Sequence, residues 1–385
     1  STQAKTLFPY TTLFRSFGAE TIRQGMMAGV VGLVLTAIFL AIYYRWAGVI
    51  ALTGLAVSLV SVVGSMALFQ FTLTMPGIAG LVLTIAMAVD ANVLIFERLR
   101  EELRDGKGLL AALDSAHDRA FSAIFDAHVT TLITSLILMG MGSGMLKGFA
   151  ITMIVGVFST LLGALIVTRV FIHWFVDPGI LTQIKISEII PHKIFKVMSY
   201  SRTFLTISVI TSAIAIGAVV IKGKESLGID YRGGAKLSFK VTDKSVTTEG
   251  IEATLKSMKV QHDGKSVDIG SHYVQASHLA GGEDMITIRT EEFAGAQVQT
   301  QLEKIYKGKI DAPKLDTVGA LIGGELASKS AWAVVLALVG IFFYLWFRYE
   351  MSFAFGALVS LIHDVIIVLG GSVLLGQELS LVHIG

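Results

Sequence analysis

The sequence predicts an α-helical polytopic membrane protein with about eight spans in two parallel pseudo-repeats, together with one small α+β extracytoplasmic domain. Three observations predict this class. Of the 385 residues, 53% are hydrophobic and only 16% are charged, whereas about a quarter of the residues in a soluble domain are charged. Apolar runs long enough to cross a bilayer recur along the chain, and one polar segment, residues 223–325, interrupts them.

Charge-free runs mark the expected spans, because a membrane helix needs roughly 20 predominantly apolar residues. No charged side chain lies between Arg23 and Arg45 or between Arg45 and Asp90, and a polar break at 70–77 divides the second run. We therefore predict helices near residues 24–44, 48–69 and 77–97. The remaining predicted spans are the runs 127–146, 148–168, 203–221 and 330–347, followed by an apolar segment near 351–376.

Basic residues gather in alternate connections between these spans, and connections of that kind normally face the cytoplasm. They include Arg45, several residues of 98–119, the segment 176–202 and Arg348. The opposite short loops have Lys147 as their only basic residue. We therefore predict that these loops, residue 17 and the segment 223–325 lie outside.

The polar segment 223–325 has the pattern of a small folded domain. Its apolar residues predict the order strand, helix, strand, strand, helix, strand. The expected elements are residues 235–241, 248–258, 272–278, 285–290, 294–307 and 314–319. This β-α-β-β-α-β order is the ferredoxin-like plan.

An internal repeat relates two parts of the chain. Residues 18–20 (GAE) parallel 323–325 (GGE), Tyr44-Arg45 parallels Phe347-Arg348, and 54–59 (GLAVSL) parallels 356–361 (GALVSL). Both copies run in the same direction, so an axis along the membrane normal would relate them, with function expected near their seam. The second copy stops at Gly385, before any counterpart of Asp90, which predicts that the chain is a fragment.

The chain divides into six predicted segments. We expect residues 1–16 not to be native, because TLFPYTTLFRS looks like translated sequencing-adapter DNA. They are followed by a five-span region at 17–175, a cytoplasmic linker at 176–202 and a single span at 203–222. The outer domain at 223–325 and a truncated membrane region at 326–385 complete the chain.

Several motifs resemble SecD and SecF, two proteins of bacterial protein export. Residues 74–80 (TMPGIAG), 88–102 (AVDANVLIFERLREE) and 126–134 (DAHVTTLIT) are similar to SecD. Residues 228–234 (GIDYRGG), 318–326 (VGALIGGEL) and 347–364 (FRYEMSFAFGALVSLIHD) are similar to SecF. The resemblance covers about residues 17–385 and is that of a fragment of a SecD–SecF (SecDF) fusion, joined in the linker 176–202.

This resemblance implies a member of the resistance-nodulation-division superfamily in the bacterial inner membrane, driven by the proton gradient and assisting late export of unfolded secretory polypeptides. It implies the SecYEG channel, SecA and YajC as partners, membrane lipid as surroundings, and no cofactor besides protons as the coupling ion. Compared with a complete SecDF, the chain lacks the first helix and the large outer domain of SecD. It also lacks the last helices of SecF. In the family, the aspartate that matches Asp90 is implicated in proton conduction, with a basic partner on those SecF helices.

Asp90 is the principal candidate residue. It lies about thirteen residues into its predicted helix, roughly 20 Å at 1.5 Å per residue, among apolar neighbours. A carboxylate at that depth is costly, so such groups become protonated, find a partner or line a water-filled path. We therefore predict that Asp90 is a proton relay. The alternative is a carboxylate that only ties helices together through hydrogen bonds.

Three further residues are candidates for the same proton path. Asp364 and His363 lie on the eighth span, where histidine could titrate near neutrality. Adjacent helix positions point in different directions, so only one of the two is expected to face the bundle. Asp126 is placed where the fourth span begins, with His128 nearby. A helix N-cap would explain Asp126 without any role in transport.

Other chemistries find no support in the sequence. There are no cysteines, the histidines show no metal-ligand spacing, and Gly323-Gly324 lacks the Lys-Ser or Lys-Thr of a phosphate loop. We find no nucleophile and base set and predict no enzyme, and the scattered basic residues predict no nucleic-acid partner.

A second function remains open on the sequence. A resistance-nodulation-division exporter of lipid or small molecules would share the membrane architecture. It would be expected to have larger outer domains with an apolar cleft and to show an efflux phenotype.

Overall fold

The structure, a computed structural model, describes residues 8–142, 144–184, 186–187, 197–243, 245–262, 265–269, 273–278, 284–311 and 313–380. Within these residues, eight helices are long and apolar enough to cross a membrane. The spans are Gly25–Tyr43, Trp46–Leu68, Pro76–Arg104, Leu109–Met141, Leu146–Val176, Met198–Lys222, Gly323–Arg348 and Met351–Leu374. The predicted class, a polytopic helical membrane protein with a small sheet, is confirmed.

The chain forms two compact units, each joining segments that are distant in sequence. The first unit contains Ser1–Tyr200 and Val335–Leu358, and the second contains Ser201–Val334 and Val359–Ile384. The helices of the first unit are α1 (Phe8–Tyr43), α2 (Trp46–Leu68), α3 (Met75–Arg104), α4 (Leu109–Met141), α5 (Gly144–Leu161), the π-helical turn η2 (Leu162–Val167), α6 (Thr168–Val176) and the 3₁₀ turn η3 (Val197–Tyr200). Helices α11 (Ala320–Arg348) and α12 (Met351–Leu374) contribute their adjoining ends to it.

Local sequence explains where several of these helices begin. The Thr74 hydroxyl accepts a hydrogen bond from the Gly77 backbone N–H at 3.1 Å and so caps α3. Only Tyr44 and Arg45 separate α1 from α2, and Arg45 has a φ of +53°, which is uncommon for a residue with a side chain. Helix α4 begins at Leu109, well before the predicted 127, because a charge-free run marks only the part of a helix suited to lipid.

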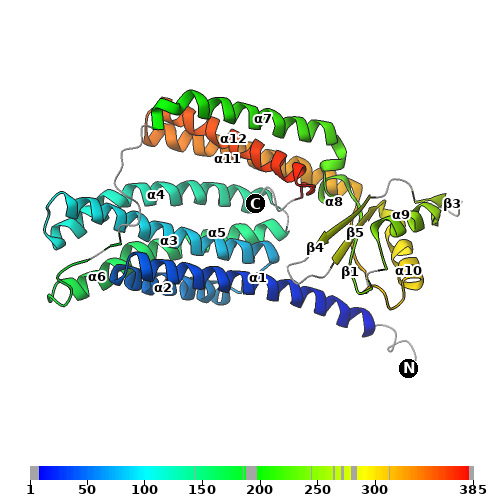
Figure 1. Cartoon of the computed structure of the whole chain (residues 1–385), viewed down its shortest axis with the longest axis horizontal. Helices are drawn as coiled ribbons and strands as arrows, with labels where there is room; N and C mark the ends of the chain where they lie inside the picture. Colours follow the sequence, from blue (N-terminus) through cyan, green and yellow to red (C-terminus); the bar gives the residue numbers. More distant parts are fainter. Residues whose placement is uncertain are drawn as a thin grey trace. The chain divides into compact units, whose positions relative to one another are not determined.

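Glycines allow close packing of helices in the first unit, where Figure 1 shows α3 and α5 side by side. A Cβ on Gly156 of α5 would lie 2.2 Å from the Thr84 Oγ1 on α3. A Cβ on Gly163 of η2 would lie 2.5 Å from the backbone oxygen of Gly54 on α2. Small residues permit such close approach between membrane helices. The contact at Gly156 therefore holds α5 close to α3, the helix that carries Asp90.

Two glycine substitutions are expected to change stability in opposite directions. Gly156→Ala forces its new methyl group against the stiff, β-branched Thr84 side chain, and overpacking of this kind costs about 1–3 kcal/mol. Gly64→Ala places the same methyl group where no atom lies within 4 Å and gains up to about 1 kcal/mol of helix propensity. Thermal unfolding of the purified protein in detergent measures both. Equal shifts in the midpoint would contradict the close approach at Gly156.

The second unit combines membrane helices with the polar domain. Its helices are α7 (Ser201–Lys222), α8 (Ile229–Arg232), α9 (Thr248–Ser257) and α10 (Gly295–Ile305), with the 3₁₀ turns η4 (Gly223–Ser226) and η5 (Glu292–Ala294) and parts of α11 and α12. Its strands are β1 (Gly234–Val241), β2 (Lys259–His262), β3 (Lys265–Asp268), β4 (Tyr273–His278), β5 (Asp284–Thr290) and β6 (Lys314–Val318).

The four-stranded sheet of this domain has the order β4-β5-β1-β6, with all neighbours antiparallel. The register places Leu237 of β1 opposite Ile288 of β5 and Leu315 of β6. Together with α9 and α10, this is the predicted ferredoxin-like plan. The short hairpin β2–β3 is an addition that the sequence pattern did not predict.

The core of the domain follows the alternation of a half-buried strand. Leu237 and Phe239 of β1 are almost completely buried and point to the side where α9 and α10 pack. The helices supply Ile251 and Leu255 from α9 and Val298 and Leu302 from α10. Figure 1 shows both helices beside the sheet.

Candidate functional site

Asp90 lies near the middle of the span Pro76–Arg104, and its side chain is exposed on the first unit. The following residues, Ala91 and Asn92, are buried, so Asp90 points away from the packed side of α3. No hydrogen bond or ion pair joins its carboxylate to another residue in the ranges that the structure covers. A carboxylate in this position needs water, a proton or a partner from outside these ranges.

His128 of α4 lies close enough to Asp90 for the carboxylate to act on its ring electrostatically. Its Nδ1 is 2.7 Å from the backbone oxygen of Ile124. Because a carbonyl oxygen only accepts, Nδ1 must carry the hydrogen. The ring is 5% exposed, and its Nε2 has no hydrogen-bond partner among the described residues. The Nε2 nitrogen is therefore an acceptor without a partner among the described residues, on a buried ring near the Asp90 carboxylate.

Asp126 lies within α4, seventeen residues after Leu109, the first residue of the helix. The N-cap explanation offered by the sequence is therefore wrong, because the helix starts several turns earlier. The carboxylate is buried, and its Oδ1 accepts hydrogen bonds from Tyr344 Oη at 2.7 Å and from Arg348 Nε at 2.9 Å. Its Oδ2 accepts one from Tyr349 Oη at 2.6 Å.

These contacts connect α4 to the end of α11 within the first unit. Arg348 also donates from Nη2 to the Ser122 hydroxyl, one turn before Asp126. Charge-assisted hydrogen bonds of this type are among the strong ones, and a carboxylate that accepts several of them is stabilised in its ionised form. Neither tyrosine was expected to contact Asp126, and Arg348 was interpreted only as a marker of orientation and as part of the repeat and of the motif 347–364.

Removing the charge of Asp126 is expected to change the titration of Tyr349. The hydrogen bond to Asp126 raises the pKa of the Tyr349 phenol above its usual value, which is near 10. The stabilisation from this bond is therefore complete below about pH 10 and is lost as the pH rises through the folded-state pKa. In Asp126→Asn, Tyr349 should ionise at lower pH. Phenolate absorbance measures this, with Tyr349→Phe as the reference. An unchanged titration in Asp126→Asn would contradict the contact, and Asp114→Asn should leave the titration as it is.

His363 and Asp364 belong to the second unit and are adjacent on α12. His363 Nδ1 lies 3.1 Å from Asp364 Oδ1. The Asp364 side chain is 67% exposed, whereas that of His363 is 34% exposed and has a buried Nε2 without a partner among the described residues. The two side chains therefore differ in surroundings although they contact each other.

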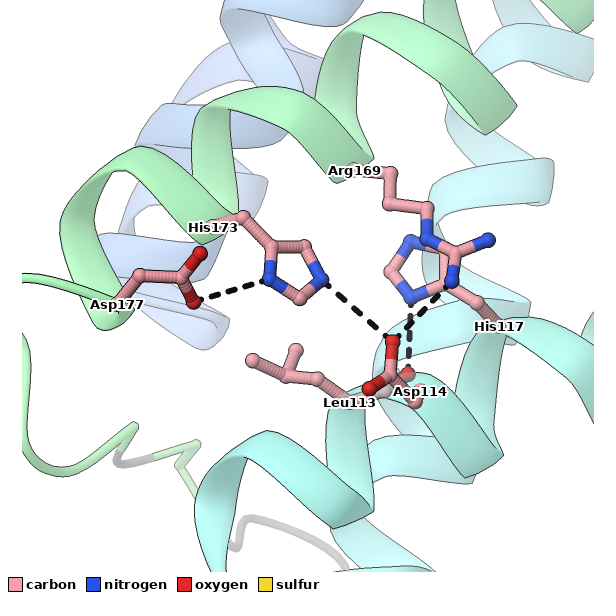
Figure 2. A network of polar contacts seen from close by, with 6 residues as sticks. All are labelled: Leu113, Asp114, His117, Arg169, His173 and Asp177. Carbon is pink, nitrogen blue, oxygen red and sulfur yellow. Dashed lines mark hydrogen bonds and ion pairs between the residues drawn. The ribbon is translucent and has the colours of Figure 1, made fainter.

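A separate polar network joins α4 to α6 (Figure 2). The Asp114 carboxylate accepts a hydrogen bond from Arg169 at 3.1 Å and lies 3.7 Å from His173 Nε2. The other ring nitrogen of His173 is 3.1 Å from Asp177, and His117 Nδ1 donates to the Leu113 backbone oxygen at 3.0 Å. Sequence reasoning missed this network. In the sequence, this network was indicated by the i, i+4 spacing of His173 and Asp177.

The loop after α12 is tied to the polar domain within the second unit. The Gly228 N–H donates to the Leu379 oxygen and the Leu379 N–H donates to the Ser226 oxygen, both at 2.8 Å. Glu378 forms an ion pair with Arg289 of β5 at 2.8 Å, and the two side chains are only 14% and 9% exposed. We call residues 376–380 and these partners the clamp.

Three more contacts complete the clamp. Gln275 of β4 donates to the Gly376 oxygen at 3.0 Å, and Arg289 also donates to the Leu227 oxygen at 3.0 Å. Tyr231 donates to the Ser380 oxygen at 3.2 Å. Burial raises the pKa of the Tyr231 phenol to about 12, so it remains a donor at neutral pH. The clamp thus links the helix that carries His363 and Asp364 to the sheet.

Most of the sequence is similar to proteins of bacterial protein export. A family profile described as "Protein export membrane protein SecD/SecF, C-terminal" matches residues 3–177 and 297–385. The match begins within the segment 1–16 that was expected not to be native. Protein translocase subunit SecDF of Brucella abortus biovar 1 (strain 9-941) is 31% identical over 384 residues, which cover 98% of this chain and 49% of that protein.

A second relative and a solved structure are similar to the chain over the same kind of region. Protein translocase subunit SecD of Syntrophobacter fumaroxidans is 50% identical over 163 residues, 42% of this chain and 31% of that protein. The crystal structure of SecDF, a translocon-associated membrane protein from Thermus thermophilus, superposes with a TM-score of 0.82 at 28% identity, covering 94% of this chain and 48% of that one. The chain spans about half the length of the SecDF proteins that it matches.

Proposed function

Because the chain belongs to the SecD/SecF C-terminal family of protein export membrane proteins, we propose that it forms part of an accessory subunit of the Sec translocase. In this proposal the proton gradient drives the subunit, which assists the late export of unfolded polypeptides. The observation that carries the proton-driven part is Asp90, a carboxylate in the middle of a membrane span with the buried His128 within electrostatic reach. Ionisable residues at that depth commonly mark proton or ion pathways.

The described residues suggest how a proton could change the protein. A proton arriving from outside would neutralise Asp90 and weaken its hold on a protonated His128, or pass between the two groups. The arrival of the proton changes the charge at the α3–α4 contact by one unit, whereas transfer between the two groups leaves the net charge there unchanged. Asp126, held by Arg348 and two tyrosines, would keep its charge and hold α4 to α11 while this happens.

The clamp would connect membrane events to the outer domain. His363 and Asp364 lie on α12, and the loop that follows α12 pairs with the domain through Glu378 and Leu379. A change of charge on α12 that moves the helix would therefore move the domain, which would hold the emerging polypeptide and prevent its backsliding. SecYEG, SecA and YajC are the proposed partners in this process.

A deletion strain tests this function against export of lipid or small molecules. Loss of the complete protein is expected to cause accumulation of secretory precursors, with drug sensitivity unchanged, and the wild-type gene should restore secretion. Pulse labelling of precursors and growth in the presence of drugs measure the two phenotypes. Altered drug efflux with normal secretion would overturn the proposal in favour of the exporter.

A further inference from the structure

Two hollows meet at Arg45, between the ends of α1 and α3 and residues 180–184 and 186–187. The first, the tryptophan hollow, has a volume of about 570 Å³ and is lined by Arg45, Trp46, Val49 and Ile180 among others. The second, the arginine hollow, has a volume of about 460 Å³ and is lined by Arg45, Arg100 and Arg104, with Ile184 and Ile186 as part of its wall. Both hollows lie within the first unit.

The wall of the arginine hollow is held in place by the chain itself. The Ser187 N–H donates to the Tyr43 backbone oxygen at 2.9 Å, and the Ser187 hydroxyl donates to the Ile42 oxygen at 3.3 Å. Ile184 is buried and belongs to the core of the unit. Ile184 and Ser187 are therefore held beside the end of α1.

Basic side chains line the arginine hollow. Arg100 is paired with Glu97, and its Nη1 donates to the Tyr43 hydroxyl at 3.3 Å. The buried Nε of Arg100 has no hydrogen-bond partner in the described part of the chain. None of the described residues that line the two hollows is acidic. A ligand with negative charge is therefore favoured there.

The internal repeat shows what Arg45 lacks. Its counterpart Arg348, also at the end of a span, is paired with the Asp126 carboxylate at 2.9 Å. No ion pair or side-chain hydrogen bond joins Arg45 to any residue among those that the structure describes. Among the described residues, Arg45 therefore has no anionic partner comparable to Asp126.

The surroundings indicate a lipid as the source of this anion. Trp46 and Ile180 are 66% and 70% exposed at the end of a membrane span, and tryptophan is enriched at the level of lipid headgroups. Basic pockets on the cytoplasmic side of membrane proteins bind anionic headgroups, and the sequence predicts that Arg45 lies on that side. We propose that the two hollows bind one anionic phospholipid, with its phosphate at Arg45 and Arg100 and an acyl chain along Trp46. This proposal does not depend on the proposed function.

Quenching of Trp46 fluorescence by brominated lipid tests the site. Trp174, Trp332 and Trp346 are replaced by phenylalanine in the full chain, which is then reconstituted in vesicles of phosphatidylcholine and phosphatidylglycerol. Composition and charge stay constant, and only the identity of the brominated lipid changes. We expect brominated phosphatidylglycerol to quench Trp46 more strongly than brominated phosphatidylcholine. Arg45→Gln should reduce the preference about fivefold, the effect of one basic group near a lipid surface.

Matched controls separate this site from general surface charge and from binding of free phosphate. Arg98→Gln removes a charge from the same end of α3 but from a side chain that is paired with Glu101 and lines neither hollow, so it should keep the preference. Equal quenching by both lipids in the parent protein, or equal losses in the two variants, would overturn the proposal. So would a preference that inorganic phosphate removes but chloride at the same ionic strength does not, since the site would then take free phosphate.

Discussion

Replacement of Asp90 by asparagine in the complete export protein is expected to abolish the part of protein export that the proton gradient stimulates. The amide is similar in size to the carboxylic acid but cannot take up or release a proton in the working pH range. Because Asp90 is exposed on α3 and makes no contact with another described residue that the substitution would break, folding and expression should be preserved. Translocation into inverted membrane vesicles, with and without a protonophore, measures the effect.

Two further variants make this result specific. Asp90→Glu retains an ionisable group and should restore part of the stimulation. Asp105→Asn alters the residue that ends the same helix, where the side chain is exposed, and should behave as the parent protein does. If the proton gradient stimulated export by Asp90→Asn as fully as export by the parent protein, Asp90 would not be part of the proton path.

The substitution Glu378→Gln is expected to loosen the clamp and to reduce export. It leaves Arg289, a side chain only 9% exposed, without its carboxylate, and removal of one partner from a buried ion pair costs about 3 kcal/mol or more. The amide hydrogens of Gly228 and Leu379, which pair the loop with the domain, should then exchange about a hundredfold faster. Hydrogen exchange read by mass spectrometry measures this.

An exposed ion pair of the same domain provides the control. Lys256 and Glu252 lie 4.0 Å apart with side chains 69% and 48% exposed, and pairs of this kind contribute at most about 1 kcal/mol. Glu252→Gln should therefore leave exchange at Gly228 and Leu379 unchanged. If Glu378→Gln also left the exchange rates of Gly228 and Leu379 unchanged, the ion pair of the clamp would not hold the loop to the sheet.

Features that repeat along the chain could be predicted from the sequence. The helix ends at Tyr43, Leu68 and Arg348 lie within one or two residues of the predicted ends, because charge and apolar length are properties of the segment itself. The order of the main strands along the chain was predicted because the apolar pattern of a strand is also a property of the segment itself. The hairpin β2–β3 was missed because its strands have four residues each, Lys259–His262 and Lys265–Asp268, and most of those residues are polar.

Contacts between distant segments could not be predicted from the same patterns. Asp90 was found because a charge within an apolar run is visible in the sequence. The donors to Asp126 lie 218 to 223 residues further along the chain, and helical periodicity does not say which distant helix will pack against a given face. The closeness of His128 to Asp90 likewise depends on the packing of α3 against α4, which no local pattern determines.

The central claim is that Asp90 takes up and releases a proton within the membrane. Infrared difference spectroscopy of the complete protein in lipid, recorded between acidic and alkaline buffer, tests it most directly, since a protonated carboxyl group has a carbonyl stretch that its ionised form lacks. We predict that acidification produces one carboxyl component in the parent protein that is missing from Asp90→Asn, while the other carboxyl groups contribute equally to both spectra. A spectrum that is identical in the two proteins would contradict the claim.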